Sequence, residues 1–395
     1  MGPRPRSPFR RATPWLVPSL LAVSVAAALT VVPGTEADDG RSAPTAAALA
    51  EPGEVRGKDG TAGSPGRPVP RPDARDVVLA VHGGAGSALD PATTPPERAQ
   101  AYRDGLANAL RAGKKALDDG GTSLDAVAAA VRVLEDDPLF NAGKGAVFNA
   151  DAEHELDASI MRGADLAAGA VAGVRSLRNP IDGARLVMEK SKHVLLSGEG
   201  ADDFGARHGL ATVTQDYYWT QARWDALLRA KEAERGGTSA ARAPEALADA
   251  RSTGTVGAVA VDRRRDLAAA TSTGGLTNKL PGRVGDSPVI GAGTYAKNGT
   301  VAASATGAGE VFIRGAATAT IANLMEFKGL GVAPAAYEVV VERLPRLGGQ
   351  GGVIALAPNG DFDAPHSSPG MLHGYLTRDG RLVTKIYPQE SPANS

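Results

Sequence analysis

Short apolar runs of buried type recur along the chain and predict β-strands. They are rich in Val, Ile, Leu and Ala, and they end at glycine or polar residues. The expected strands cover 76–81, 155–161, 168–174, 256–261, 267–272, 289–295, 301–305, 352–356, 362–364 and 382–387. Pro358, Asn359 and Gly360 predict a hairpin turn between two of them.

Other segments carry apolar residues at helical spacing. The expected helices cover 95–117, 124–135, 180–190, 201–208, 219–233, 310–327 and 334–347. Ser123 is the expected cap of the second helix. His82 to Gly86 is expected to be a glycine turn, and 140–148 a loop that turns into a strand. Helices that bracket two runs of strands favour two sheets packed face to face with helices outside.

The first 75 residues carry a different pattern. An arginine-rich start followed by the apolar run 15–32 is typical of a secretory signal peptide, here 1–37, read by either the general or the twin-arginine export route. Pro18 within this marginal apolar length disfavours the alternative of a membrane anchor. Residues 38–75 are rich in Pro, Gly, Ala and charge, which predicts a disordered linker. We therefore expect a secreted protein whose fold starts near residue 76.

The composition and the motifs exclude several kinds of catalytic and binding site. The chain has 395 residues and no cysteine, which excludes thiol nucleophiles and zinc–thiolate sites. A net charge of -1 and 4% aromatic residues argue against a nucleic-acid or membrane partner. His82-Gly-Gly resembles the oxyanion segment of lipases, but the sequence has no Gly-x-Ser-x-Gly elbow. It also has no phosphate-binding Walker loop, and His154 lacks the second histidine of a zinc helix.

The strand at 256–261 starts abruptly after the polar segment 229–254, which predicts a flexible linker and a place where the chain can be cut. Thr255 carries a hydroxyl at this join. A break between Gly254 and Thr255 would give Thr255 an α-amine of pKa about 7.7–8, able to take the hydroxyl proton. Gly254 has no Cβ to block the attack. The alternative is that Thr255 is an ordinary strand residue.

Further polar residues follow later strands. Arg283 can grip a carboxylate and Asp286 an ammonium, so together they suit the charged groups of an amino acid. Thr273 can orient the Thr255 amine, while Thr306 and the Gly307 N–H can stabilise an oxyanion. The alternatives are a solvated ion pair for Arg283 and Asp286, and backbone-capping hydroxyls for the threonines.

Ten segments, in this order, resemble the plant-type asparaginase and isoaspartyl peptidase family of N-terminal nucleophile (Ntn) hydrolases. They are His82–Gly86, Phe140–Gly143, Gly145–Phe148, His154–Ala158, Gly169–Val174, Leu177–Pro180, Gly254–Val259, Ala270–Gly275, Thr277–Pro288 and Gly309–Arg314. The resemblance spans nearly all of 77–387. It implies a four-layer αββα sandwich of the α/β (α+β) class, made of an α chain 76–254 and a β chain 255–395 that arise by self-cleavage.

The resemblance also implies an (αβ)2 assembly that hydrolyses isoaspartyl dipeptides and L-asparagine through an acyl-enzyme on Thr255. Thr273 and Thr306 match its supporting threonines, and Asn141 a residue beside the oxyanion. Arg283, Asp286, Thr306 and Gly307 match its substrate-binding residues. No cofactor is expected to be required. A structural Na⁺ or K⁺ is implied on backbone carbonyls of a loop, with Leu134, Glu135, Asp137, Phe140, Ala142 and Lys144 as its residues.

The chain departs from the family at Asp136, Asp137 and Lys144 in that loop, and at His366–Pro369 near the expected pocket rim. Two other functions are compatible with the pattern. One is an aspartylglucosaminidase-like amidase acting on glycosylasparagine. The other is a secreted, catalytically silent protein that binds amino acids.

Overall fold

The computed structural model describes residues 70–236, 254–388 and 390. The predicted signal peptide 1–37, the linker up to residue 69 and the segment 237–253 lie outside the described residues. No described helix has the length and apolar character needed to cross a bilayer.

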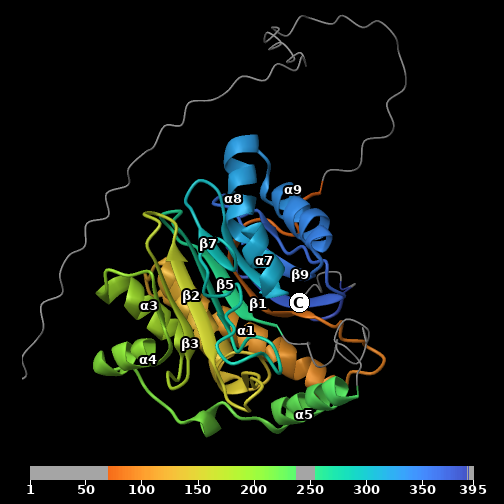
Figure 1. Ribbon diagram of the computed structural model, residues 1–395. Coiled ribbons are helices and arrows are strands. Elements are labelled where there is room, and N and C mark those ends of the chain that lie inside the picture. The colour runs from red at the N-terminus through yellow and green to blue at the C-terminus, as the bar shows by residue number, and fades with distance from the viewer. Residues whose placement is uncertain (1–69, 237–253, 389, 391–395) are drawn as a thin grey trace, which may run out of the picture. The chain divides into compact units, whose positions relative to one another are not determined.

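The described residues form two sheets with helices on both outer sides (Figure 1). The larger sheet has the strand order β12-β11-β1-β5-β6-β2-β3-β4. Its strands are β1 (Val77–Gly86), β2 (Leu156–Arg162), β3 (Ala168–Val174), β4 (Leu195–Ser197), β5 (Val256–Val261), β6 (Leu267–Thr273), β11 (Gly370–Thr377) and β12 (Leu382–Lys385). The smaller sheet has the order β10-β9-β8-β7, from β7 (Thr294–Ala296), β8 (Ala302–Gly307), β9 (Gly351–Leu356) and β10 (Phe362–Asp363).

Helices cover the outer face of each sheet. On the larger sheet lie α1 (Pro96–Asp118), α2 (Ser123–Asp136), α3 (Pro180–Lys190) and α4 (Gly198–Arg207). On the smaller sheet lie α7 (Gly309–Gly315), α8 (Ala317–Lys328) and α9 (Val332–Tyr337). The helix α5 (Gln221–Arg235) precedes the segment that is not described. This is the four-layer αββα arrangement expected from the sequence.

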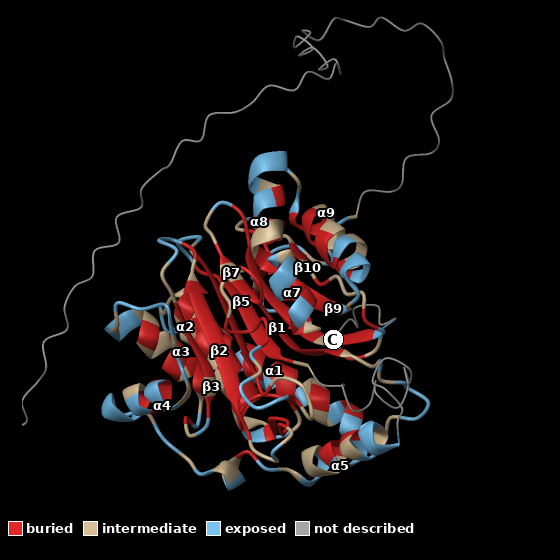
Figure 2. Cartoon of the chain, viewed as in Figure 1, coloured by how far each residue is buried: buried red, intermediate tan, exposed pale blue. Residues whose placement is uncertain are grey.

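Each interface between layers has its own apolar core, because successive strand residues point to opposite faces. In β5, Val256, Ala258 and Ala260 pack toward the helices, whereas Val259 and Val261 pack toward the second sheet. A third cluster lies between the smaller sheet and α7–α9. The strands are accordingly buried almost throughout (Figure 2).

Several elements have the predicted bounds. The strands β3 and β5 and the helix α3 match the predicted ranges, and the hairpin at 358–360 joins β9 to β10. The cap of α2 is Thr122 rather than Ser123. Its hydroxyl accepts from Asp125 N, and the Asp125 carboxylate accepts from Thr122 N.

Other predictions were wrong. His82–Gly86 is not a turn, because β1 extends through it with a bulge between His82 and Gly84. Of 289–295 only its end joins β7, and 146–148 forms no strand. The strand β11 was missed, since Gly370 and Gly374 weaken its local signal and its order comes from pairing with β1.

The two long C-terminal helices are interrupted. The expected helix 310–327 breaks at Ala316, which has left-handed dihedrals, φ 42° and ψ 52°. The expected helix 334–347 continues α9 as a π-helical stretch, 338–343, and a 3₁₀ turn, 344–347.

Candidate active site

Thr255 directly precedes β5 and lies on the face of the larger sheet that is turned toward the smaller sheet. The register pairs Val256 with Ser272, so Thr255 lies beside Thr273 on the neighbouring strand. The Thr255 hydroxyl donates to Thr273 Oγ1 over 3.2 Å. Thr273 Oγ1 also accepts from Gly275 N at 2.9 Å. Thr255 retains only 8% of its accessible surface. The structure thus brings the predicted nucleophile and its supporting threonine into contact.

The backbone before Thr255 presses against β1. A Cβ on Gly84 would lie 2.2 Å from Gly254 Cα, and a Cβ on Gly254 would lie 1.7 Å from Gly84 Cα. Gly84 also has φ +120°, which side chains rarely adopt. Both positions therefore require glycine. The close approach fixes the peptide that was predicted to be cut.

Thr306 reaches the same place from the smaller sheet. It is fully buried on β8, and its hydroxyl accepts from Ala85 N at 3.0 Å. Within the described residues no acceptor takes its own hydroxyl proton. Gly307 follows with φ +140°, and a Cβ there would lie 2.5 Å from Gln350 O. Period-two alternation explains the convergence, since Thr255, Thr273 and Thr306 all occupy inner-face positions of their strands.

Asn141 joins the loop after α2 to the loop after β6. Its side-chain oxygen accepts from Val147 N at 3.0 Å, and its amide nitrogen donates to Gly275 O at 2.8 Å. A Cβ on Gly274 would lie 2.6 Å from the same side-chain oxygen. Asn141 is therefore held in a fixed orientation next to the Thr273–Gly275 turn.

Arg283 and Asp286 lie in a cradle of glycines. A Cβ on Gly309 would come within 2.9 Å of Asp286 Oδ1 and 3.0 Å of Arg283 Nη2. Gly275 and Gly285 also approach the guanidinium. The alternative of a solvated ion pair between the two was wrong. Arg283 donates twice to Glu310, at 3.0 and 2.8 Å, while Asp286 is 3% exposed.

Asp286 carries a perturbed carboxyl group. Burial raises its pKa to about 7, and the nearby Arg283 lowers it in part. Its Oδ2 atom has no hydrogen-bond partner among the described residues. A buried acceptor of this kind is suited to an ammonium group.

A buried ladder of polar side chains between the sheets was not anticipated. His82 Nε2 lies 2.9 Å from Ser304 Oγ, which lies 2.7 Å from Thr271 Oγ1. Thr271 bonds to Thr294, whose hydroxyl lies 2.7 Å from Ser159 Oγ, and Ser159 donates to the carbonyl of Ser287. The signal was present in the sequence as polar residues at inward positions of apolar strands.

His82 is fully buried at one end of this ladder. Burial lowers the pKa of its imidazole to about 3, so the ring is neutral at ordinary pH. It lies on β1, opposite Gly257 of the neighbouring strand β5, and connects the larger sheet to Ser304 of the smaller one. The ladder ends at Ser287, the residue after Asp286, so one polar network spans both halves of the candidate site.

The expected alkali-metal loop folds back over the end of α2. A Cβ on Gly143 would lie 2.3 Å from Glu135 O, and one on Gly145 would lie 2.2 Å from Phe140 O. The carbonyls of Asp137 and Ala142 each accept one backbone hydrogen bond, from Phe140 and Gly145. A carbonyl oxygen has a second lone pair, so this turn fits a cation held by backbone oxygens.

The residues that depart from the family pattern interact with neighbouring side chains and backbone groups. The Asp136 carboxylate accepts from the Tyr217 hydroxyl at 3.0 Å, and Asp137 accepts from Leu139 N at 3.0 Å. Lys144 lies over the Tyr217 ring. Ser367 exchanges hydrogen bonds with Gly351, which pairs with Gly307. The His366–Pro369 segment therefore borders the site without entering the threonine cluster.

Comparison with known proteins agrees with this geometry. A family model described as asparaginase matches residues 75–386. The isoaspartyl peptidase of Salmonella typhimurium is 50% identical over 311 residues, covering 79% of this chain and 98% of the relative. That of Escherichia coli is 48% identical over 314 residues, covering 80% and 97%. The isoaspartyl peptidase/L-asparaginase of Mus musculus is 42% identical over 313 residues, covering 78% and 90%.

Proposed function

The chain belongs to the asparaginase family of hydrolases, and from that premise we propose that it cleaves isoaspartyl dipeptides and L-asparagine. The relatives named above carry these activities in their names. The observation that carries the proposal is the Thr255–Thr273 hydroxyl contact directly after a glycine held against β1.

The first step is activation of the precursor. The Thr255 oxygen attacks the carbonyl carbon of Gly254, and the Gly254–Thr255 amide bond breaks as an ester forms. Water then hydrolyses the ester, which leaves a carboxylate on Gly254 and a free amine on Thr255. The close packing of Gly254 against Gly84 supports this step, because it restricts the backbone next to the bond that is cut.

In the mature enzyme the same hydroxyl attacks the side-chain carbonyl of the substrate. Its proton passes through the Thr255 amine to the leaving nitrogen, the C–N bond breaks, and an aspartyl ester forms. Water cleaves the ester and releases aspartate. Arg283 would hold the substrate carboxylate and Asp286 its ammonium, while Thr306 and the Gly307 N–H would donate to the oxyanion.

The Thr255→Ala variant tests the proposal. On a denaturing gel the parent should give two fragments, and the variant should remain one uncut chain. Ammonia release from L-asparagine should fall at least 1,000-fold, since the proposed nucleophile is lost. Cleavage between residues 254 and 255 in the variant would refute the cis-nucleophile mechanism.

We also propose that a sodium or potassium ion stabilises the loop 134–145. The convergence of the Glu135 and Phe140 carbonyls on the turn 143–145 supports this. When bound, the ion would neutralise the carbonyl dipoles and brace Asn141. The melting temperature should rise in sodium or potassium chloride relative to choline chloride at equal ionic strength. Equal melting temperatures would refute the site.

The remaining proposals concern the assembly and the compartment. An (αβ)2 assembly is supported by family resemblance, and sedimentation of the cut enzyme tests it. Export is supported by the arginine-rich and apolar pattern of 1–37. Mass spectrometry of protein recovered outside the cell tests it, and an intact residue 1 there would count against signal removal.

A further inference from the structure

A small cavity adjoins Gly254, the residue directly before Thr255. Its volume is about 50 Å³, enough for about three waters or a carboxylate group. Gly254, Gly84 and Asn141 contribute to its wall. Arg283 and Asp286 do not line it, so the cavity is distinct from the residues proposed to hold the aspartyl part of the substrate.

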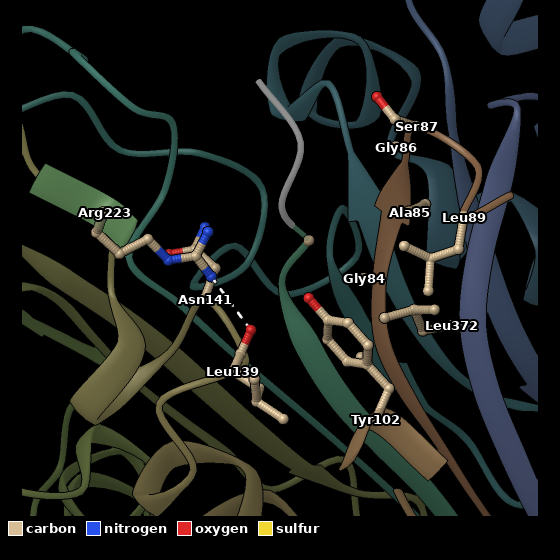
Figure 3. A pocket seen from close by; sticks show the side chains of 12 residues that line it. Gly84, Ala85, Gly86, Ser87, Leu89, Tyr102, Leu139, Asn141, Arg223 and Leu372 are labelled. Atoms are coloured by element: carbon tan, nitrogen blue, oxygen red, sulfur yellow. Dashed lines mark hydrogen bonds between the residues drawn. The ribbon is translucent and has the colours of Figure 1, made fainter. Parts of the chain in front are cut away.

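Arg223 supplies the cavity with a positive charge. The side chain extends from α5 toward Leu139 and Asn141, with the Tyr102 ring across the cavity (Figure 3). Its Nε atom donates to Gly145 O at 2.7 Å and its Nη2 to Leu139 O at 3.5 Å. A guanidinium has five N–H donors, so three remain after these two bonds.

This cation has no counter-ion in the described part of the chain. No Asp or Glu forms an ion pair with Arg223, and no other ionised side chain lines the cavity among the described residues. Burial lowers the pKa of the guanidinium to about 10, so it stays charged at neutral pH. A partly buried, uncompensated cation favours an anionic ligand.

Two hydroxyl groups share the cavity. Ser87 Oγ is buried and has no hydrogen-bond partner among the described residues. The Tyr102 ring packs edge-on against Phe140, which fixes its orientation beside the cavity. In Figure 3 the Tyr102 hydroxyl points toward Arg223, whereas Ser87 lies apart from the guanidinium. Arg223 and Tyr102 are therefore the groups that match the acceptor oxygens of a carboxylate.

The rest of the wall is apolar. Leu89, Leu139 and Leu372 line the cavity, and each keeps part of its surface exposed. An apolar side chain of a ligand would bury this surface. The cavity therefore combines a carboxylate-binding end with an apolar wall.

We propose that this cavity is the subsite for the leaving amino acid of an isoaspartyl dipeptide, with Arg223 binding its free α-carboxylate. The cavity holds the carboxylate, and an apolar side chain such as that of leucine would lie outside it against the exposed parts of Leu89, Leu139 and Leu372. The inference rests on the proposed function. It adds that the enzyme distinguishes a dipeptide from L-asparagine, whose leaving ammonia makes no contact with Arg223.

Three substrates test the subsite: β-aspartyl-leucine, its C-terminal amide, and L-asparagine. The parent should have a kcat/KM at least tenfold higher for the acid than for the amide, mainly through KM. In Arg223→Gln this ratio should fall to within threefold of one. The loss on β-aspartyl-leucine should exceed the loss on L-asparagine at least tenfold.

Arg229→Gln is the matched control, since Arg229 is an exposed arginine on the same helix. It should keep the parental acid-to-amide ratio. Equal turnover of acid and amide by the parent would overturn the subsite even if Arg223→Gln fails to fold. If Arg223→Gln lowers kcat/KM equally for the dipeptide and for L-asparagine, Arg223 only holds the loop in place, and the subsite is wrong. A parent inactive on all three substrates would instead refute the proposed function.

Discussion

At the scale of single residues, the candidate site contrasts two charged side chains three positions apart. Arg283 keeps 16% of its side chain exposed and has Glu310 as a partner. Asp286 is buried, and its Oδ2 has no partner among the described residues. The arginine is thus already paired, whereas the carboxylate lacks the cation that would offset its burial.

This contrast predicts a pH dependence of substrate binding. Burial raises the pKa of Asp286 to about 7, and only the ionised form binds an ammonium group. We expect 1/KM for L-asparagine to rise with pH up to about 7 and then level off. The kcat profile should lack this limb, because bound substrate keeps Asp286 ionised.

Initial-rate kinetics between pH 5 and 9 would measure both profiles. Asp286→Asn should lower kcat/KM about 10- to 100-fold, the cost of one charged hydrogen bond, and remove the limb in 1/KM. The limb from the Thr255 amine should persist in kcat. If 1/KM still rises with pH in the variant, the rise belongs to a group other than Asp286.

We expect the buried Asp286 carboxylate to lower the free energy of unfolding at neutral and alkaline pH. Its folded pKa lies above its unfolded value, so between about pH 4 and 7 the folded state binds more protons than the unfolded state. The free energy of unfolding contributed by Asp286 therefore falls as pH rises through this window. We expect Asp286→Asn to melt higher than the parent at pH 8, with little difference at pH 4. Scanning calorimetry at both pH values measures this, and a lower melting temperature at pH 8 would contradict it.

At the scale of elements, β1 combines two tasks. It pairs with β5 and β11 in the middle of the larger sheet, and it presents Gly84 to the peptide before Thr255. A strand that runs through glycines is weak on its own. Hydrogen bonding to a strand on each side stabilises β1 despite its glycines. Because Gly84 has no side chain, β1 can approach Gly254 more closely than a Cβ would allow.

This approach predicts the effect of Gly84→Ala. The new Cβ would lie 2.2 Å from Gly254 Cα at a backbone φ of +120°, so residue 254 must move. We expect self-cleavage to slow at least tenfold, measured as the fraction of uncut chain over time on a denaturing gel. Gly200→Ala on α4 is the control, because its Cβ would meet nothing within 4 Å. Normal cleavage in Gly84→Ala would show that the close approach is dispensable.

At the scale of the whole molecule, the two sides of the cut are interleaved. In the larger sheet β1 lies between β11 and β5, and β6 pairs with β2. Segments before residue 254 are thus hydrogen-bonded to segments after it on several edges. The apolar core between the helices and this sheet also draws on both sides.

The cut enzyme should therefore behave as one folded unit. We expect the two fragments to co-elute in gel filtration without denaturant and to unfold in one calorimetric transition, because no interface separates them. Urea should be needed to part them. Elution of two separate fragments under native conditions would contradict the shared sheets.

Much of this protein follows from sequence alone. Strand and helix segments such as 168–174, 180–190 and 256–261 have strong local patterns. Thr255, Arg283 and Asp286 are marked by residue chemistry and by ordered motifs, because a nucleophile next to a cut and a pair of opposite charges are visible without coordinates.

Other features depend on contacts between distant segments. The order of β11 arises from pairing with β1, and the break at Ala316 arises where two helices must both reach the smaller sheet. The buried ladder from His82 to Ser159 exists only once the strands are assembled. The same holds for the position of Arg223, which has no counter-ion among the described residues, beside Tyr102 of α1. Sequence determines what each residue can do, but burial and partners set its charge state and contacts, and only the tertiary structure supplies those.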